Sequence, residues 1–93
     1  MGRLLSGEEV ATAAKGVPAW TLAEKSVERE FTLADFAAAL AFVNKVGAAA
    51  EAADHHPDIL MHGWNKVRLT LSTHSAGGLT ENDFKLAREI DAL

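Results

Sequence analysis

The sequence contains no cysteine, and its other scarcities narrow the possible functions further. Without cysteine the chain cannot form disulfides, zinc–thiolate sites or thiol nucleophiles. Its nine lysine and arginine residues are scattered and its formal net charge is -4, which disfavours the clustered basic surface that nucleic acid requires. No apolar run approaches the roughly 20 residues of a membrane span, and Glu8 and Glu9 interrupt any signal-peptide core. We therefore expect a cytoplasmic protein that binds neither nucleic acid nor membrane.

The chain does have enough apolar content for one packed domain. Hydrophobic residues make up 48% of the 93 positions, which favours a folded core over disorder. This length fits a single domain over residues 1–93 and not two. A domain of this size buries a smaller share of its surface than a large one, so association with copies of itself would add stability.

Three segments begin with the same helix-start pattern, in which an apolar residue precedes Ser or Thr and an acid follows three residues later. The pairs are Ser6 with Glu9, Thr32 with Asp35, and Thr80 with Asp83. In such a capping box the hydroxyl accepts from a free N–H of the first turn and the acid reaches back to the cap. Apolar residues then recur at helical spacing, which predicts helices over residues 7–15, 33–54 and 81–92.

Strand patterns fill the gaps between these helices. Residues 66–73 alternate cleanly, with Val67, Leu69 and Leu71 on one face. Shorter strands are predicted at residues 20–22, 27–31 and 59–61, which gives the order α-β-β-α-β-β-α. The steps between successive strands are short, and short steps join antiparallel strands. We predict an α+β fold with two layers, a four-stranded antiparallel sheet with the helices packed on one face.

All four histidines lie within twenty residues, at positions 55, 56, 62 and 74. Glu51 precedes His55 by four residues, which places both on one face of the long helix's last turn. Pro57 ends that helix. His74 follows the strongest strand and precedes the flexible pair Gly77-Gly78, a common setting for site residues.

Three interpretations of these histidines are open from the residues alone. They could close a helix, where imidazolium suits the negative end. They could bind a metal with Asp54 and Asp58, although no spacing matches a pattern such as H-E-x-x-H. They could act as general acid and base, because the ordinary pKa of histidine lies near neutral pH.

Several spaced elements of this region resemble the signature of pterin-4a-carbinolamine dehydratases. They are Glu51-x-x-x-His55-His56-Pro57, the run Trp64-Asn65-Lys66-Val67, the run of residues 73–80, and Asp83. The tight match covers about a third of the chain, and the predicted element order fits the family fold throughout. Two departures are visible. The loop from Pro57 to Trp64 is one residue longer than in animal members, and Ile59 stands where those members carry an aromatic residue.

The resemblance implies a dehydratase that converts 4a-hydroxytetrahydropterin to quinonoid dihydropterin and water, in tetrahydrobiopterin recycling, without a cofactor or a metal. It implies His55 and His74 as catalytic acid and base. It also implies that His56, Glu51 and Trp64 bind the substrate, although Glu51 could instead orient His55 and Trp64 could instead lie in the core.

The resemblance also bears on partners and on Asp83. Family members form homodimers or homotetramers, and the alanine-rich second helix is compatible with either. Some animal members bind a transcription factor, so the alternative function is a non-catalytic dimerisation or protein-interaction cofactor with the same fold. The intact set of Glu51, His55, His56 and His74 favours the enzyme. Asp83 belongs to the signature, but its capping role alone accounts for it.

Overall fold

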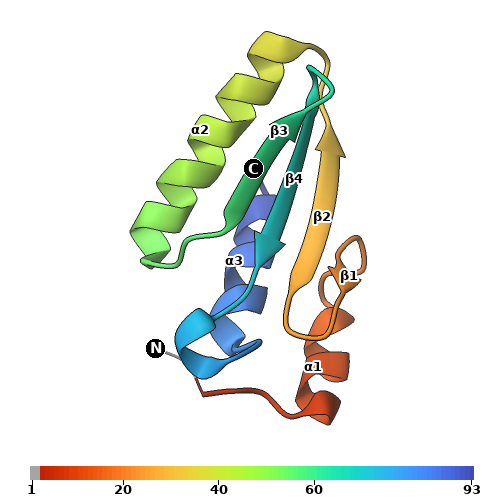
Figure 1. The fold of residues 1–93 in the computed structure, drawn as a ribbon, viewed down its shortest axis with the longest axis vertical. Coiled ribbons are helices and arrows are strands. Elements are labelled where there is room, and N and C mark those ends of the chain that lie inside the picture. Colours follow the sequence, from red (N-terminus) through yellow and green to blue (C-terminus); the bar gives the residue numbers. More distant parts are fainter. Residues whose placement is uncertain (1–2) are drawn as a thin grey trace.

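The computed structural model describes residues 3–93, and its elements follow the predicted order (Figure 1). They are α1 (Gly7–Ala14), β1 (Thr21–Leu22), β2 (Val27–Thr32), α2 (Phe36–Ala53), β3 (Asp58–His62), β4 (Lys66–Leu71), the short 3₁₀ helix η1 (His74–Ala76) and α3 (Glu81–Asp91). The α+β prediction is confirmed, and η1 is the element that the sequence patterns did not indicate.

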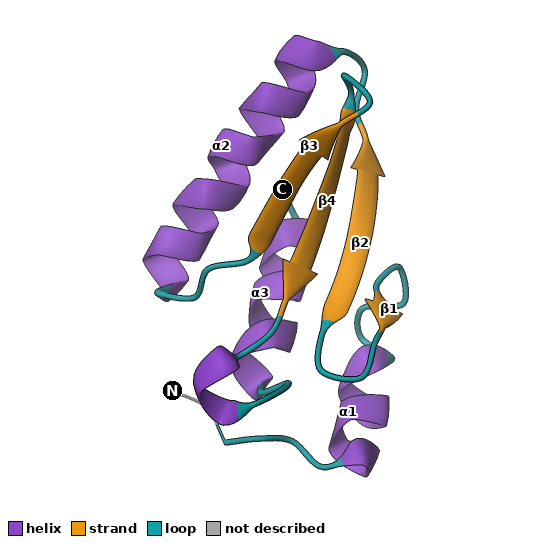
Figure 2. Ribbon diagram, in the orientation of Figure 1, coloured by secondary structure: helices purple, strands orange, loops and turns teal. Residues whose placement is uncertain are grey.

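The four strands form one antiparallel sheet in the order β1-β2-β4-β3 (Figure 2). Strand β4 is central, and Leu69 lies between Arg29 of β2 and Ile59 of β3. The β3–β4 pair is a local hairpin, whereas β2 and β4 are neighbours in space but are separated in the chain by α2 and β3. The central pairing of the sheet, between β2 and β4, therefore joins segments that are distant in the sequence.

One face of the sheet carries the core. Val67, Leu69 and Leu71 of β4 are fully buried and belong to the same cluster as residues of α2 and α3, which include Val46, Ala50, Phe84, Leu86 and Ile90. Lys66, Arg68 and Thr70 alternate with them and are only half-buried. The prediction that the helices pack on one face, with the polar positions of β4 outward, is confirmed.

The start of α2 differs from the prediction. Thr32 does not cap a helix, because it is the last residue of β2 and pairs with Lys66. Asp35 is itself the cap, and its carboxylate accepts from the N–H of Ala38 at 2.8 Å. The helix therefore begins at Phe36 and not at Leu33, because strand pairing extends through the predicted cap. The capping boxes at Ser6 and Thr80 are confirmed.

The end of α2 also falls earlier than predicted. Asp54 takes the left-handed conformation (φ 49°), and the N–H of His55 donates to the carbonyl of Ala50 at 3.1 Å. This is the usual way in which a left-handed residue terminates a helix, and aspartate tolerates that conformation better than most residues. His55 and His56 thus lie outside the helix, and the helical spacing assumed between Glu51 and His55 does not hold.

Much of α2 faces outward. Its buried residues are Ala39, Val46 and Ala50, whereas the side chains of Phe36 and Leu40 are about half exposed. By length and composition α2 could cross a membrane, with a mean hydropathy of 1.3, yet its buried side chains pack into the core of its own chain. The outward side of α2 is an apolar surface that nothing in the described chain covers.

Candidate functional site

The segments that carry the predicted site histidines converge at one end of the sheet, where α2 and β4 end and α3 begins (Figure 1). His55 is the second residue after α2, His74 opens η1 as the third residue after β4, and Asp83 lies in the first turn of α3. The structure joins these three segments through hydrogen bonds to a single carboxylate.

Asp83 is that carboxylate, and it is fully buried. Its Oδ1 lies 2.5 Å from Nε2 of His55. Its Oδ2 accepts from the hydroxyl of Thr73 at 2.8 Å and from the backbone N–H of Thr80 at 2.9 Å. A buried charge is tolerated only where its oxygens are hydrogen-bonded. Both oxygens of Asp83 meet this condition, and together they tie the end of β4 and the residue after α2 to the start of α3.

The Thr73 hydroxyl fixes the direction of the remaining bond in this network. It lies 2.9 Å from the hydroxyl of Thr80. Each hydroxyl has one hydrogen to donate. Since Thr73 donates to Asp83, Thr80 is the donor to Thr73. Thr73 is also the residue immediately before His74, so the network reaches from His55 to the neighbour of the second predicted catalytic histidine.

The contact with Asp83 orients the imidazole of His55. An ionised carboxylate only accepts hydrogen bonds, so Nε2 of His55 carries the hydrogen and Nδ1 of the neutral ring keeps its lone pair. Such a partner commonly fixes which nitrogen of a functional histidine is free. Sequence reasoning assigned Asp83 to helix capping alone, which describes only Oδ2. No local pattern indicates the bond of Oδ1, because His55 lies 28 residues away.

Glu51 contacts a different histidine from the one expected. Its carboxylate pairs with Nε2 of His56, and both side chains are exposed. The suggestion that Glu51 orients His55 is wrong in this structure, because the left-handed turn at Asp54 removes His55 from the face of the helix. An exposed pair of this kind contributes little to stability. Glu51 and His56 therefore remain accessible at the end of α2.

His74 lines a groove of about 380 Å³ on the side of the sheet that the helices leave open. The other lining residues include Asp58, Thr70 and Ser72, and Asp58 is the register partner of Thr70. Asp58 offers acceptors and Thr70 a hydroxyl to a polar ring, whereas Ser72 can only accept, because its hydroxyl donates to the carbonyl of Lys25. Sequence reasoning named Asp58 only as a possible metal ligand and did not single out Thr70 or Ser72 as site residues, although the outward position of Thr70 and Ser72 could have indicated a shared face.

His55 does not line the same groove. It borders a smaller hollow of about 130 Å³ between α2 and α3, together with Asn82, Lys85 and Glu89. The structure thus brings His55 and His74 to one end of the molecule and links them through Asp83 and Thr73, but it does not place both rings in one hollow. Among residues 3–93, no group of three histidine or carboxylate side chains has the arrangement of metal ligands.

Trp64 lies at the opposite end of the sheet, in the turn between β3 and β4 (Figure 2). It is 60% exposed, so it is not a core residue. Its backbone is left-handed (φ 59°), an uncommon conformation for a bulky side chain. Within one chain the structure does not bring Trp64 to His55, His56 or His74. Nearby, His62 contacts Glu30 at 2.5 Å, and this bond is the main reason that the pKa of Glu30 is lowered.

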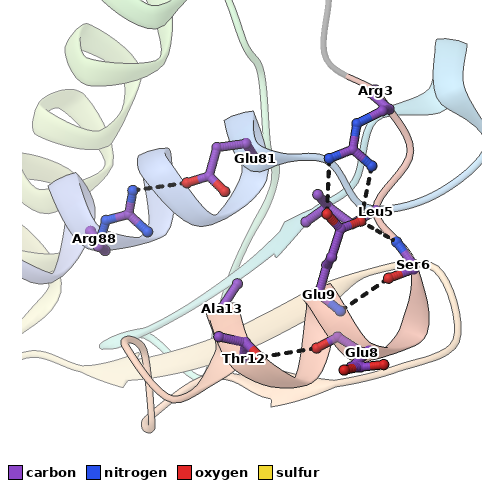
Figure 3. Close-up of a pocket in the computed structure, with 9 residues that line it drawn as sticks. All are labelled: Arg3, Leu5, Ser6, Glu8, Glu9, Thr12, Ala13, Glu81 and Arg88. Atoms are coloured by element: carbon purple, nitrogen blue, oxygen red, sulfur yellow. Dashed lines mark hydrogen bonds and ion pairs between the residues drawn. The ribbon is translucent and has the colours of Figure 1, made fainter.

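A larger hollow lies away from these residues, between α1 and α3 (Figure 3). It measures about 700 Å³, and its walls carry charged side chains that already pair with one another. Arg3 donates two bonds of 2.9 Å to Glu9, and Arg88 donates to Glu81 at 3.2 Å. None of the predicted site residues borders this hollow. Its size therefore does not make it the candidate site.

The fold and the site define a small α+β protein with a histidine–carboxylate network at one end of an antiparallel sheet. Comparison with protein families gives the particular family. The model described as pterin 4 alpha carbinolamine dehydratase matches residues 3–93. The chain belongs to this family.

Relatives and solved structures agree with this assignment. A Nocardia farcinica protein, named as a candidate pterin-4-alpha-carbinolamine dehydratase, is 51% identical over 90 residues, which cover 97% of this chain and 94% of that protein. A Chloroflexus aurantiacus protein with the same name is 52% identical over 89 residues, or 96% of this chain and 95% of the relative.

Two solved structures share the fold. The crystal structure described as a transcriptional coactivator/pterin dehydratase from Brucella melitensis superposes with a TM-score of 0.87 at 34% identity, covering 95% of each chain. A pterin dehydratase-like protein, described as a RuBisCO assembly factor in the α-carboxysome, matches with a TM-score of 0.63 at 24% identity, over 78% of this chain and 83% of that one. The second likeness is one of fold alone.

Proposed function

We propose that this protein is a dehydratase that converts 4a-hydroxytetrahydropterin to quinonoid dihydropterin and water. The observation that carries the proposal is the buried Asp83, which holds His55 and is joined through Thr73 to the segment of His74. A buried pair of this kind is often less stabilising than apolar packing of the same volume. The presence of a buried histidine–carboxylate pair in place of apolar side chains therefore favours a role for it beyond folding.

The reaction needs one proton donor and one proton acceptor. A proton must reach the hydroxyl group that leaves C4a, and the hydrogen on N5 must be removed, so that water and the quinonoid ring result without a change in oxidation state. Histidine can fill either role near neutral pH, and each role contributes about 10²–10⁴-fold. We assign the two roles to His74, which faces the groove, and His55, whose Nδ1 lone pair is left free by Asp83.

The remaining predicted site residues have separate parts in this proposal. His56, exposed at the end of α2, would hold the pterin ring, and Glu51 beside it would accept from ring N–H groups. Trp64 lies at the far end of the same sheet, so it could contribute to substrate binding only from a second copy of the chain. We propose no cofactor and no metal for the reaction, and a cytoplasmic location.

We further propose that the protein is a homodimer or homotetramer associated through α2. Phe36 and Leu40 are one helical turn apart and about half exposed, so they form one apolar strip. A Leu40→Glu substitution should shift the mass measured by light scattering to that of the single chain. Glu89→Gln on α3 is the surface control. An unchanged mass for Leu40→Glu would place the contact elsewhere.

The test of the catalytic proposal is dehydration followed by ultraviolet absorbance, with the hydroxylated pterin generated in place by a hydroxylase. We expect wild type to accelerate dehydration and His74→Ala or His55→Ala to lose about 10²–10⁴-fold, with unchanged circular dichroism. His62→Ala is the matched control, since His62 pairs with Glu30 away from the groove. A folded wild type that gives no acceleration would overturn the proposal and favour the alternative, a protein-interaction cofactor that associates through α2.

A further inference from the structure

A second hollow lies beside the groove that contains His74. This second hollow measures about 310 Å³ and shares two lining residues, Lys25 and Gly77, with the first. Beyond them its walls are largely apolar and include Leu4 and Val10. Two neighbouring hollows therefore share Lys25 and Gly77 as lining residues, one polar on the open face of the sheet and one apolar beside the segment that precedes α1.

The walls of the second hollow are held in place by hydrogen bonds and by close packing. The hydroxyl of Ser72 donates to the carbonyl of Lys25 at 2.7 Å, which fixes the loop between β1 and β2 against β4. The N–H of Leu5 donates to the carbonyl of Leu79 at 2.9 Å. A Cβ at Gly78 would lie only 2.9 Å from Cδ1 of Leu4, so the glycine is what allows Leu4 to lie there.

We propose that this apolar hollow holds the substituent at C6 of the pterin and so determines which pterins the protein accepts. The inference rests on the proposed function. In a pterin, C6 is bonded to N5, and N5 is bonded to the reacting C4a. The 2-amino-4-oxo edge lies at the other end of the ring system. With that edge on Asp58 and Thr70 and with C4a at His74, the C6 substituent leaves the ring towards Gly77 and Leu4.

The lining predicts the chemistry of the preferred substituent. Leu4 and Val10 suit aliphatic carbons, while Glu24 and Lys25 at the rim suit hydroxyl groups. A short hydroxylated alkyl chain such as dihydroxypropyl matches both features, whereas a methyl group reaches neither. Contacts of this kind in an open apolar site change kcat/KM by roughly 3–10-fold, below the range for an enclosed pocket.

The test compares two substrates in matched variants. We would measure kcat and KM for the 4a-hydroxy forms of 6-(dihydroxypropyl)- and 6-methyltetrahydropterin. For Leu4→Ala we expect KM for the dihydroxypropyl substrate to rise about 3–10-fold, with the methyl substrate unchanged. Leu93→Ala is the control, because Leu93 and Leu4 are both 51% exposed and Leu93 lines neither hollow. This control should leave kcat and KM unchanged for both substrates.

A second variant tests the same hollow without removing a side chain. Gly78→Ala displaces the end of the flexible Leu4 side chain, and its backbone bonds with Thr73 remain possible. We expect it to alter the ratio of the two kcat/KM values while kcat for the methyl substrate stays at the wild-type level. If both variants change kcat/KM equally for the two substrates, the inference is overturned and the proposed function stands. If wild type dehydrates neither substrate, it is the proposed function that fails.

Discussion

Helices α1 and α3 begin with the same motif and use it in different surroundings. At α1, Ser6 and Glu9 form a capping box on the surface, and the Glu9 carboxylate also accepts two hydrogen bonds from Arg3. At α3, Asp83 caps Thr80 through one oxygen and holds His55 with the other, fully buried. Helix α1 has no buried residue, whereas α3 buries five. One local motif thus serves helix formation alone in one place and site geometry in the other.

The difference shows that a capping acid has two oxygens and that the cap occupies only one of them. What the second oxygen meets depends on the tertiary fold. At the surface it meets an arginine that solvent also screens, and such pairs contribute little. In the interior it meets His55, where an unpaired partner would be costly. Substitutions at the two motifs should therefore differ in size and in kind.

The largest effect is expected from Asp83→Ala. This change leaves His55, the Thr73 hydroxyl and the Thr80 N–H without their common acceptor in the interior. Breaking such a buried network lowers the free energy of unfolding by roughly 3–5 kcal/mol. Urea unfolding followed by circular dichroism measures it. A decrease in the free energy of unfolding below about 1 kcal/mol would mean that water replaces the carboxylate. The two capping acids would then not differ in their contribution to stability.

Asp83→Glu sharpens the comparison, because it gives α3 the Ser/Thr-x-x-Glu form found at α1. The longer side chain can still reach the cap but displaces the oxygen that faces His55, and an added methylene in a packed site costs about 1–3 kcal/mol. We expect a folded protein with dehydration slowed about 10²-fold or more. Glu9→Asp at α1 is the reciprocal control, with wild-type activity. Wild-type activity for Asp83→Glu would show that the position of the Asp83 carboxylate is not critical.

Ser6→Ala should have a smaller effect, confined to stability. Loss of a serine cap typically lowers the free energy of unfolding by about 1 kcal/mol. The rate of dehydration of the 6-methyl substrate should stay at the wild-type value, because Ser6 contacts none of the site residues. Equilibrium unfolding and the absorbance assay, run on the same sample, check both statements. A slower reaction would show that α1 supports the site after all.

The smallest effect is the pH dependence at Glu9. Hydrogen bonds from Arg3 hold the pKa of Glu9 down from 4.5 to about 2. A lowered pKa in the folded state means that the stabilisation is complete above the unfolded value of 4.5 and is lost as pH falls towards 2. The stability difference between wild type and Glu9→Gln should therefore shrink over that interval. Because the pair is exposed, added salt should shrink it as well. A difference that is constant from pH 2 to 6 would contradict this account.

The sequence was sufficient for much of the fold because local signals and packing agree there. The alternation in β4 and the caps at Ser6 and Thr80 are confirmed by burial and hydrogen bonding. The predicted helix cap at Thr32 was wrong because the cap pattern competes with strand pairing to Lys66, and that pairing involves a distant segment. A local motif cannot report such competition.

The site was less predictable for the same reason. The clustering of the histidines in the sequence indicated a functional site. The hydrogen-bond partners of His55 and His56, however, are determined by the turn at Asp54 and by the packing of α3. The spacing of Glu51 and His55 assumed a helix that in fact ends at Ala53. The bond from His55 to Asp83 and the groove beside Thr70 and Ser72 join segments that are remote in sequence. The roles proposed for the predicted site residues are tested by the experiments described above.

The strand order has a consequence for how the chain reaches this structure. Strand β4 meets β3 across a short turn, but it meets β2 only after α2 and β3 have been spanned. Closing the longer loop costs more chain entropy before any contact repays it. We therefore expect the β3–β4 hairpin to form early and β2 to dock late. Val67→Ala should slow folding, whereas Val27→Ala should mainly accelerate unfolding, in stopped-flow measurements of both rates. Since Thr73 and His74 lie two and three residues after β4, the segment that carries the site would be anchored by the part of the sheet that forms first.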